Sequence, residues 1–182
     1  MIERFVFSGS GGQGVITAAI IMAEAALHYE GLHVVQTQTY GPEARGGAAR
    51  ADVIVSDEEI YFPRVLEPNV LVCLSQRAYD RYTDGVRPGG IIVLDPFFVH
   101  TRSEVNSRQV PVPVHESVVA EFGSSQAINM CMLGAVSRLI PLVSLDALKE
   151  ISRDRFDERF EATNLRALEI GYALVTESVG TF

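Results

Sequence analysis

A strand, a glycine-rich turn and the start of a helix follow one another directly within residues 2–27. The apolar segment 2–8 precedes Gly-Ser-Gly-Gly-Gln-Gly at 9–14, and a second apolar segment follows at 15–27. Gly9, Gly11 and Gly14 have the G-x-G-x-x-G spacing that lets a backbone approach a phosphate group at a helix N-terminus. Four glycines in six residues cost conformational entropy, so the turn needs backbone freedom. The segment predicts an α/β fold and indicates where a ligand or a partner could sit.

Strand and helix patterns alternate along the remaining chain. Segments with strand character occur at 32–39, 49–56, 70–75, 91–95 and 110–114, and the prolines in the last of these restrict it to a sheet edge or an extended link. Helices are expected at 76–82, 127–139, from 145 onward after Ser144 as N-cap, and 164–175. The order predicts one domain over residues 1–182 with a three-layer, doubly wound, Rossmann-like α/β fold. Its sheet is expected to be mostly parallel, and its C-terminal part helical.

Composition excludes several classes of function. The net charge is -8 and no cluster of lysines and arginines occurs, so nucleic-acid binding is not expected. The apolar stretch after the glycine turn contains Thr17 and Glu24, which is typical of a buried helix rather than a membrane span. No secretory signal pattern is recognisable, so a cytoplasmic location without membrane contact is expected.

The chain offers no obvious catalytic or metal-binding set. Cys73 and Cys131 both lie in apolar segments and are expected to be buried, reduced thiols. Two cysteines cannot ligate an iron–sulfur cluster by themselves, so another chain would have to hold any cluster. The four histidines are scattered, and no serine has the surroundings of a hydrolase nucleophile. We therefore predict no catalytic residue and no metal ligand in this chain.

The glycine turn alone does not identify its ligand. A dinucleotide site needs an acidic residue at the end of the second strand, but residues 36–39 are Gln-Thr-Gln-Thr. A P-loop is excluded because no Lys-Ser or Lys-Thr follows the glycines. The remaining interpretations are a phosphate or diphosphate site at the helix N-terminus, and tight strand–helix packing without a ligand. Gln13 could reach across a cleft or cap its own backbone.

A second glycine-rich segment, 40–47, follows the second strand. Arg45 adds a planar cation, Glu43 an acid, and Gly46 and Gly47 an uncovered backbone. Ligands of open α/β sheets bind at the carboxyl ends of the strands, so this segment is expected beside the first turn. A solvated turn with an internal Glu43–Arg45 pair is the alternative. The convergence of two glycine-rich segments on one sheet edge favours binding.

Together these motifs resemble the gamma subunit of 2-oxoacid:ferredoxin oxidoreductases. The matching residues extend along nearly the whole chain: Gly-Ser-Gly-Gly-Gln-Gly-Val at 9–15, Thr-Tyr-Gly-Pro-Glu-Ala-Arg-Gly-Gly at 39–47, Asp-Val-Ile-Val-Ser-Asp at 52–57, Pro-Asn-Val-Leu-Val at 68–72, Pro-Gly-Gly at 88–90, Asn129, and Leu-Gly-Ala at 133–135. Either glycine motif alone would be weak, but the two in this order are specific. The fold of the family is doubly wound α/β, in agreement with the pattern above.

The resemblance implies a role as one subunit of an enzyme rather than a catalyst in isolation. The family converts a 2-oxoacid and coenzyme A, the co-substrate, to acyl-CoA and carbon dioxide, and it reduces ferredoxin. Thiamine diphosphate and iron–sulfur clusters are implied on the partner subunits, namely alpha, beta and, where present, a ferredoxin-like delta subunit. An isolated gamma chain would expose its docking surface and could self-associate as a dimer.

The string before Arg45 separates the branches of this family. The indolepyruvate type usually has a His-Gly-Met-Ala-Gln-like string there, whereas this chain has Tyr-Gly-Pro-Glu-Ala. This favours the pyruvate, 2-oxoisovalerate and 2-oxoglutarate branch. The length of 182 residues and the Thr-Gln-Thr-Tyr lead-in are most similar to 2-oxoglutarate-type subunits. An indolepyruvate-type subunit, a stand-alone nucleotide-binding α/β protein and a non-catalytic scaffold remain the alternatives.

The hypothesis places coenzyme A at the two glycine-rich segments. The first turn would supply backbone donors near the phosphates, Arg45 would add positive charge, and segment 40–47 would roof the active site. The predicted binding residues are Gly9, Gly11, Gly12, Gln13, Gly14, Tyr40, Gly41, Pro42, Glu43, Arg45, Gly46 and Gly47.

Overall fold

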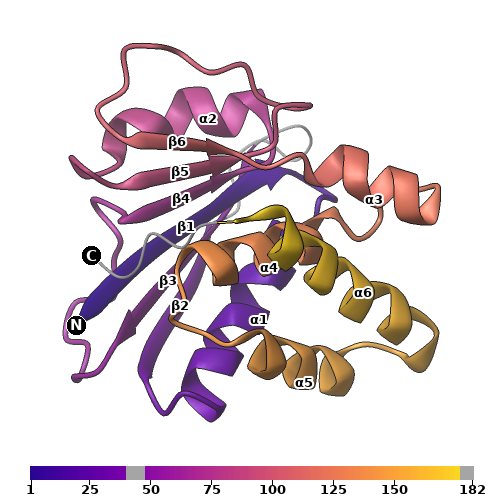
Figure 1. The fold of residues 1–182 in the computed structure, drawn as a ribbon. Coiled ribbons are helices and arrows are strands. Elements are labelled where there is room, and N and C mark those ends of the chain that lie inside the picture. The colour runs from indigo at the N-terminus through magenta and orange to yellow at the C-terminus, as the bar shows by residue number, and fades with distance from the viewer. Residues whose placement is uncertain (40–47, 177–182) are drawn as a thin grey trace.

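The computed structural model describes residues 1–39 and 48–176. A six-stranded sheet in the order β2-β3-β1-β4-β5-β6 forms the centre of the molecule (Figure 1). The strands are β1 (Ile2–Ser10), β2 (His33–Thr39), β3 (Ala48–Ser56), β4 (Val70–Cys73), β5 (Ile91–Leu94) and β6 (Arg108–Pro111). Strands β1, β4, β5 and β6 pair in parallel, whereas β3 pairs antiparallel with both β1 and β2. Among the described strands only β3 runs against the others, so the sheet is mostly parallel, as predicted.

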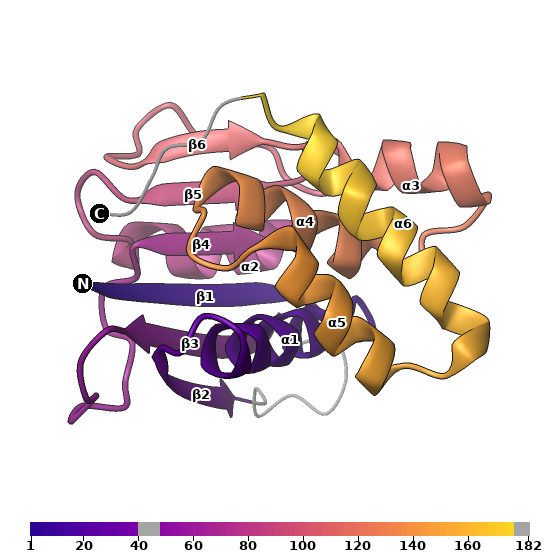
Figure 2. The same cartoon turned by 60° about the horizontal axis from the view of Figure 1, so that its bottom comes forward.

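Helices cover both faces of this sheet and make three layers (Figures 1 and 2). The helices are α1 (Val15–His28), α2 (Gln76–Tyr82), α3 (Val114–Phe122), α4 (Ile128–Leu139), α5 (Leu145–Arg155) and α6 (Glu158–Leu174), with a short 3-10 turn at Thr83–Gly85. Helices α1, α4, α5 and α6 lie on one face, and α2 lies on the other. None of the described helices is long and apolar enough to cross a membrane.

The central strand β1 contributes to two hydrophobic cores, because successive side chains point to opposite faces of a sheet. Phe5 and Phe7 pack toward α1 and the C-terminal helices, and both side chains are fully buried. Val6 packs on the other side, in the core that includes Tyr79 of α2. The uninterrupted apolar sequence of β4 and β5 follows from burial on both faces.

Helices α4 and α6 touch through their backbones. A Cβ atom added to Gly134 would lie 2.0 Å from the carbonyl oxygen of Leu168, and one added to Gly171 would lie 1.7 Å from that of Cys131. These two glycines allow α4, which is buried along most of its length, to lie between α6 and the sheet.

Most element boundaries differ from the sequence prediction by one to three residues, and two helices differ more. β6 is an edge strand as expected, but a helix, α3, begins directly after Pro113, where only extended chain was predicted. Pro113 is the N-cap residue of α3, and proline is compatible with the start of a helix because the N–H group that it lacks would have no partner within the helix. Helix α6 begins at Glu158, ahead of the predicted start, and the side chain of Asp157 accepts a hydrogen bond from the amide of Arg159 at its N-terminus.

Candidate functional site

The glycine turn joins β1 to α1 in a conformation that requires glycine at two positions. Gly12 and Gly14 have φ angles of 91° and 71°, in the left-handed region that side chains disfavour. Gly14 is the N-cap residue of α1, and no side chain caps this helix end. The turn therefore directs the N-terminus of α1 toward the edge where β1, β4 and β5 end.

Gln13 fixes the turn to the neighbouring strand. Its side-chain oxygen accepts a hydrogen bond of 2.7 Å from the amide of Ser10, and its Nε2 donates one of 2.7 Å to the carbonyl of Leu74, just past the end of β4. Gln13 thus bonds to the backbone of its own turn and to the chain just past β4, but it does not cap helix α1. A Cβ atom on Gly9 would lie 2.6 Å from the same side-chain oxygen, so packing explains this glycine.

Asn129 supports the turn from the opposite end of the sequence. It lies in the first turn of α4, is 8% exposed, and donates a hydrogen bond of 3.2 Å from Nδ2 to the carbonyl oxygen of Gly14. A Cβ atom on Gly14 would lie 2.5 Å from this Nδ2. Asn129 thus holds the N-terminus of α1 in place.

The outer side of the turn is open. A Cβ atom on Gly11 or on Gly12 would have no other heavy atom within 4 Å. The amides of Gly11, Gly12 and Gly14 donate to no described residue, and the first turn of α1 has no acidic side chain. Unpaired amides at a helix N-terminus bind anions, and the helix dipole favours negative charge there. The turn is therefore suited to hold a phosphate or diphosphate.

The second glycine-rich segment is attached at the same edge. Its predicted binding residues Tyr40, Gly41, Pro42, Glu43, Arg45, Gly46 and Gly47 lie outside the described residues. The flanking strands are described: Ala48 pairs with Ser10 of β1, and Thr39 pairs with Arg50. The described residues on either side of the segment therefore lie at this end of the sheet, Ala48 beside β1 and Thr39 two strands away on β2, and the binding role of the segment stays a prediction.

A hollow of 390 Å³ lies next to the turn on the helical side. Its lining includes Thr17 of α1, Asn129 of α4, and Phe160 and Asn164 of α6. Phe160 is 47% exposed, whereas Asn164 is buried. A ligand at the turn could extend into this partly apolar space.

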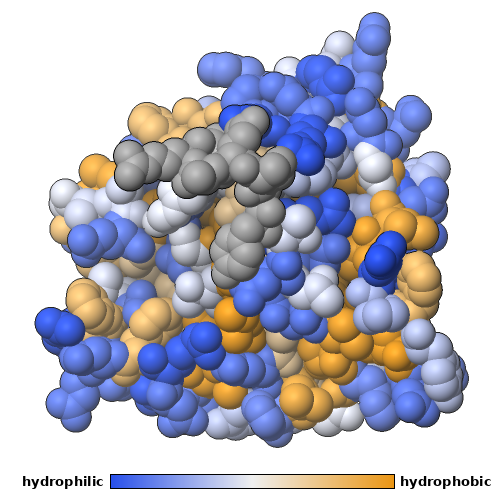
Figure 3. Space-filling model, turned by 180° about the vertical axis from the view of Figure 1, so that it is seen from behind, coloured by the Kyte–Doolittle hydropathy of each residue, from blue (hydrophilic) through white to orange (hydrophobic). Residues whose placement is uncertain are grey.

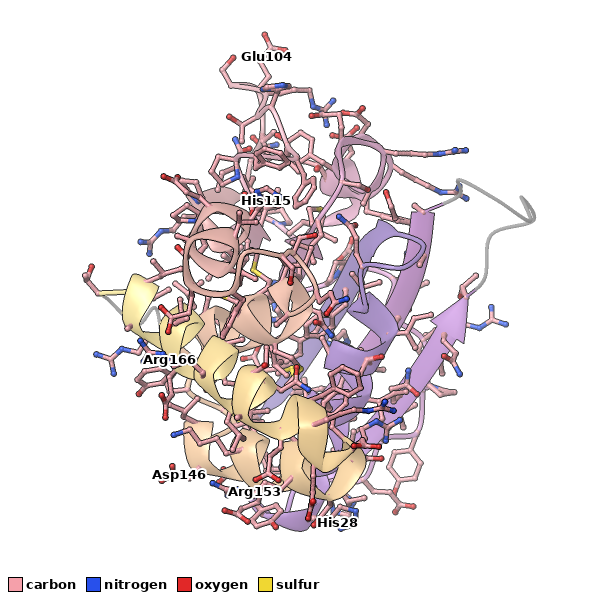
Figure 4. The ribbon with its side chains drawn as sticks, turned by 90° about the vertical axis from the view of Figure 1, so that its right-hand side faces the viewer. His28, Glu104, His115, Asp146, Arg153 and Arg166 are labelled. Carbon is pink, nitrogen blue, oxygen red and sulfur yellow. The ribbon has the colours of Figure 1, made fainter. Side chains whose placement is uncertain are left out.

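Asp95 lies at the same edge but is not among the predicted site residues. It follows β5, and its buried carboxylate accepts hydrogen bonds from the amides of Phe97 at 2.8 Å and His115 at 2.6 Å. Burial raises the pKa of this carboxyl group above its ordinary value, although both amides favour the charged form. The His115 ring stacks on Phe97 with a centroid distance of 3.7 Å (Figure 4, which views this edge). An acid directly after a fully apolar strand is the sequence signal for this position.

The described residues contain no group of three side chains of His, Cys, Asp or Glu that could hold a metal ion. Cys73 and Cys131 are buried, as predicted. Burial raises the pKa of the Cys131 thiol to about 12 and raises that of Cys73 as well. The two acids nearest to the glycine turn in the following sequence, Glu24 and Glu30, do not face the turn. Glu24 forms an ion pair with Arg155, and Glu30 accepts a hydrogen bond from the amide of Ser144.

Comparison with known proteins identifies similar sequences and structures. Residues 4–174 match the profile of the family described as pyruvate ferredoxin/flavodoxin oxidoreductase. The 2-oxoglutarate synthase subunit KorC of Methanocaldococcus jannaschii is 41% identical over 179 residues, which cover 97% of this chain and 96% of the relative.

Two solved structures share the fold. The keto/oxoacid ferredoxin oxidoreductase gamma subunit of Geobacter sulfurreducens PCA has a TM-score of 0.86 and 33% identity, with 95% of each chain covered. The 2-oxoglutarate:ferredoxin oxidoreductase of Magnetococcus marinus, solved with 2-oxoglutarate, coenzyme A and succinyl-CoA bound, has a TM-score of 0.86 and 28% identity. That match covers 98% of this chain and 32% of the longer one.

Proposed function

Because the chain belongs to the pyruvate ferredoxin/flavodoxin oxidoreductase family, we propose that it is the gamma subunit of a 2-oxoglutarate:ferredoxin oxidoreductase and that its glycine turn binds the diphosphate of coenzyme A. The observation that supports the binding role is that the amides of Gly11, Gly12 and Gly14 donate to none of the described residues. The substrate is inferred from the similarity to KorC, and the co-substrate from the coenzyme A in the Magnetococcus marinus enzyme.

The redox and decarboxylation groups are proposed to lie on partner subunits. The donor set of this chain does not fit an iron–sulfur cluster, since its two cysteines are both buried in the hydrophobic cores. The sequence also has no thiamine-binding motif of the Gly-Asp-Gly kind followed by an asparagine-rich stretch. Partner subunits of alpha and beta type would carry thiamine diphosphate and the clusters, and ferredoxin would accept the electrons.

The described geometry supports a binding role for the turn. Backbone N–H groups donate to phosphate oxygens without a side chain between them, because Gly11 and Gly12 leave the outer surface uncovered. Gln13 and Asn129 hold the turn rigid from two sides, so little conformational entropy is lost on binding. Arg45, in the adjoining segment, would supply a positive charge for the same phosphates.

The test is a Gly11→Leu variant in the assembled complex. A Cβ atom at this position meets no other atom, and its φ angle is not in the left-handed region, so the variant should fold normally. The leucine side chain would cover the amides, and we expect the apparent KM for coenzyme A to rise about tenfold or more, as for the loss of a charge-assisted hydrogen bond. The KM for 2-oxoglutarate should not change. Arg45→Ala is expected to raise the KM for coenzyme A in the same way.

The matched control is Ala120→Leu, which adds the same side chain to an exposed position of α3 and should leave both constants unchanged. Equal KM values for coenzyme A in the Gly11→Leu variant and the native complex would remove the turn from this role. An increase in the KM for 2-oxoglutarate alone would instead place the turn near the oxoacid.

A further inference from the structure

The loop between β3 and β4 presents three large apolar side chains to solvent, at the edge of the sheet opposite the glycine turn. Tyr61, Phe62 and Leu66 are 84%, 59% and 71% exposed. Single exposed apolar residues are common on protein surfaces, but several in one short loop are typical of an interaction site. Figure 3, which shows the α2 side of the molecule, has hydrophobic patches in its lower middle and at its right-hand margin.

The rest of the molecule holds this loop in place. Val65 is buried, and its carbonyl oxygen accepts a hydrogen bond of 3.1 Å from the guanidinium of Arg50 on β3. At the end of the loop, the amide of Asn69 donates a hydrogen bond of 2.8 Å to the carbonyl of Arg4. Burial of Val65 turns its neighbours Arg64 and Leu66 outward, so these side chains are displayed by a fixed backbone.

Three arginines lie around two of the exposed apolar residues, Phe62 and Leu66. A depression of 740 Å³ is lined by Arg4, Arg64 and Arg87 together with Phe62 and Leu66. None of these arginines forms an ion pair with a described residue, and Glu67 is the only acid in the described lining. The same loop begins with the exposed acids Asp57, Glu58 and Glu59, and a neighbouring depression that also contains Leu66 is lined by Asp84 and Glu104. The positive charge is therefore confined to the depression lined by Arg4, Arg64 and Arg87, within a chain of net charge -8.

Leu66 lies where this depression meets a second basic one. The second depression, of 600 Å³, is also lined by Leu66 and Arg64, and it adds Arg81 and Tyr82 of α2. The Arg81 guanidinium lies 5.6 Å from the centre of the Tyr82 ring. Arg81 forms no ion pair with a carboxylate of the described residues. An apolar centre with arginine and aromatic residues around it is the typical composition of a protein–protein interface.

We propose that the docking surface, defined as Arg4, Phe62, Arg64, Leu66 and Arg87, binds an acidic segment of a partner subunit. Carboxylates of the partner would pair with the arginines, and an apolar side chain would pack on Phe62 and Leu66. A second copy of this chain would bring the same arginines into contact and is disfavoured by repulsion. A small anion would leave Phe62 and Leu66 uncovered.

A partner subunit docked at this end of the strands leaves the glycine turn, at their other end, accessible to a ligand.

The experiment measures the affinity of this chain for the remaining subunits of its complex. We expect the double variant Arg64→Glu/Arg87→Glu to bind about tenfold more weakly or worse, because charge reversal turns attraction into repulsion. The native affinity should fall as salt concentration rises, and that of the double variant should not. Leu66→Ala should weaken binding without changing the salt dependence, which separates the apolar contact from the charges.

The control is Arg159→Glu/Arg166→Glu, which makes the same change of charge at exposed positions of α6. Equal affinity of the docking-surface variants and the native chain, with melting temperatures that show folded protein, would overturn the proposal. Loss of inorganic phosphate binding by calorimetry with assembly unchanged would overturn it too, in favour of a small-anion site. A Gly11→Leu chain should assemble normally, so failure of the coenzyme A proposal would be distinguishable from failure of this one.

A crosslink identifies the partner segment. Leu66→Cys adds an accessible thiol to a chain whose own cysteines are both buried. A photoreactive maleimide at this position should react with a partner segment rich in Asp and Glu. A crosslink to a segment without acidic residues, or to a second copy of this chain, would contradict the proposal.

Discussion

At the scale of single residues, the glycines of the first turn have different physical roles. Gly9 leaves room for the Gln13 side chain, Gly14 combines a left-handed backbone with the close approach of Asn129, and Gly11 has open space around it. The G-x-G-x-x-G spacing predicted the position of the turn and the orientation of the helix. It could not distinguish these roles, since they depend on Leu74 and Asn129, which lie far away in the sequence.

Gly14→Ala should destabilise the protein by about 2 kcal/mol, because a methyl group adds left-handed strain and a clash with Asn129. Urea denaturation of the isolated chain measures this difference. Gly85→Ala is the control, since its Cβ atom would meet nothing within 4 Å and its φ angle is not left-handed. Equal stability of the two variants would mean that Asn129 moves away without loss.

At the scale of elements, contacts between distant segments determine what local patterns could not predict. The strands at 70–75 and 91–95 were predicted because burial on both faces leaves a continuous apolar run. Helix α3 was missed because its sequence begins after two prolines, and the amide of His115 in its first turn donates to Asp95 from another element rather than to a local side-chain cap. Segment 40–47 lies outside the described residues, so its binding role stays a prediction.

Asp95 should make the stability depend on pH in the mildly acidic range. Burial raises its pKa in the folded protein, so between the ordinary value of about 4 and the raised value the folded state binds more protons than the unfolded state. Stability therefore decreases as pH rises through this window. The free energy of unfolding of the native chain minus that of Asp95→Asn should fall from about pH 4 upward.

Subtracting the free energy of unfolding of Asp95→Asn from that of the native chain cancels the contribution of every group that titrates equally in both proteins. The pH dependence of the difference therefore belongs to Asp95. Denaturation curves at a series of pH values provide the measurement. A difference that increases with pH would mean that the amides of Phe97 and His115 outweigh burial.

The contact between α4 and α6 predicts a large effect from one added methyl group. Gly134→Ala would place a Cβ atom 2.0 Å from the carbonyl oxygen of Leu168, so the helices must separate or rotate. We expect a loss of about 3 kcal/mol, at the upper end for overpacked cores. Chemical denaturation, again with Gly85→Ala as control, measures the loss. A loss below that of Gly14→Ala would show that α6 shifts freely.

At the scale of the whole molecule, the two edges of one sheet have different properties. The edge where β1, β4 and β5 end carries the glycine turn and the attachment points of segment 40–47. The opposite edge carries the exposed apolar side chains of the docking surface and its arginines, which form no ion pair with the residues that the structure describes. The glycine spacing predicted the first edge, because it is a local motif. Nothing in the sequence predicted the second, since Arg4, Arg64 and Arg87 come together only when β1, β4 and β5 are aligned side by side.

Strand β1 connects these two edges as a single rigid element. It carries Arg4 near its start and Gly9 near its end, and its nine residues span about 26 Å at a rise of about 3.3 Å per residue. If the chain is held at the docking surface, a rotation there also displaces the glycine turn at the other end of β1. Gly9 lies five residues, or about 17 Å, from Arg4, so a rotation of about 5° around that surface would move the glycine turn by about 1.5 Å. A small adjustment at a remote subunit contact could thereby open or close the space around a bound phosphate.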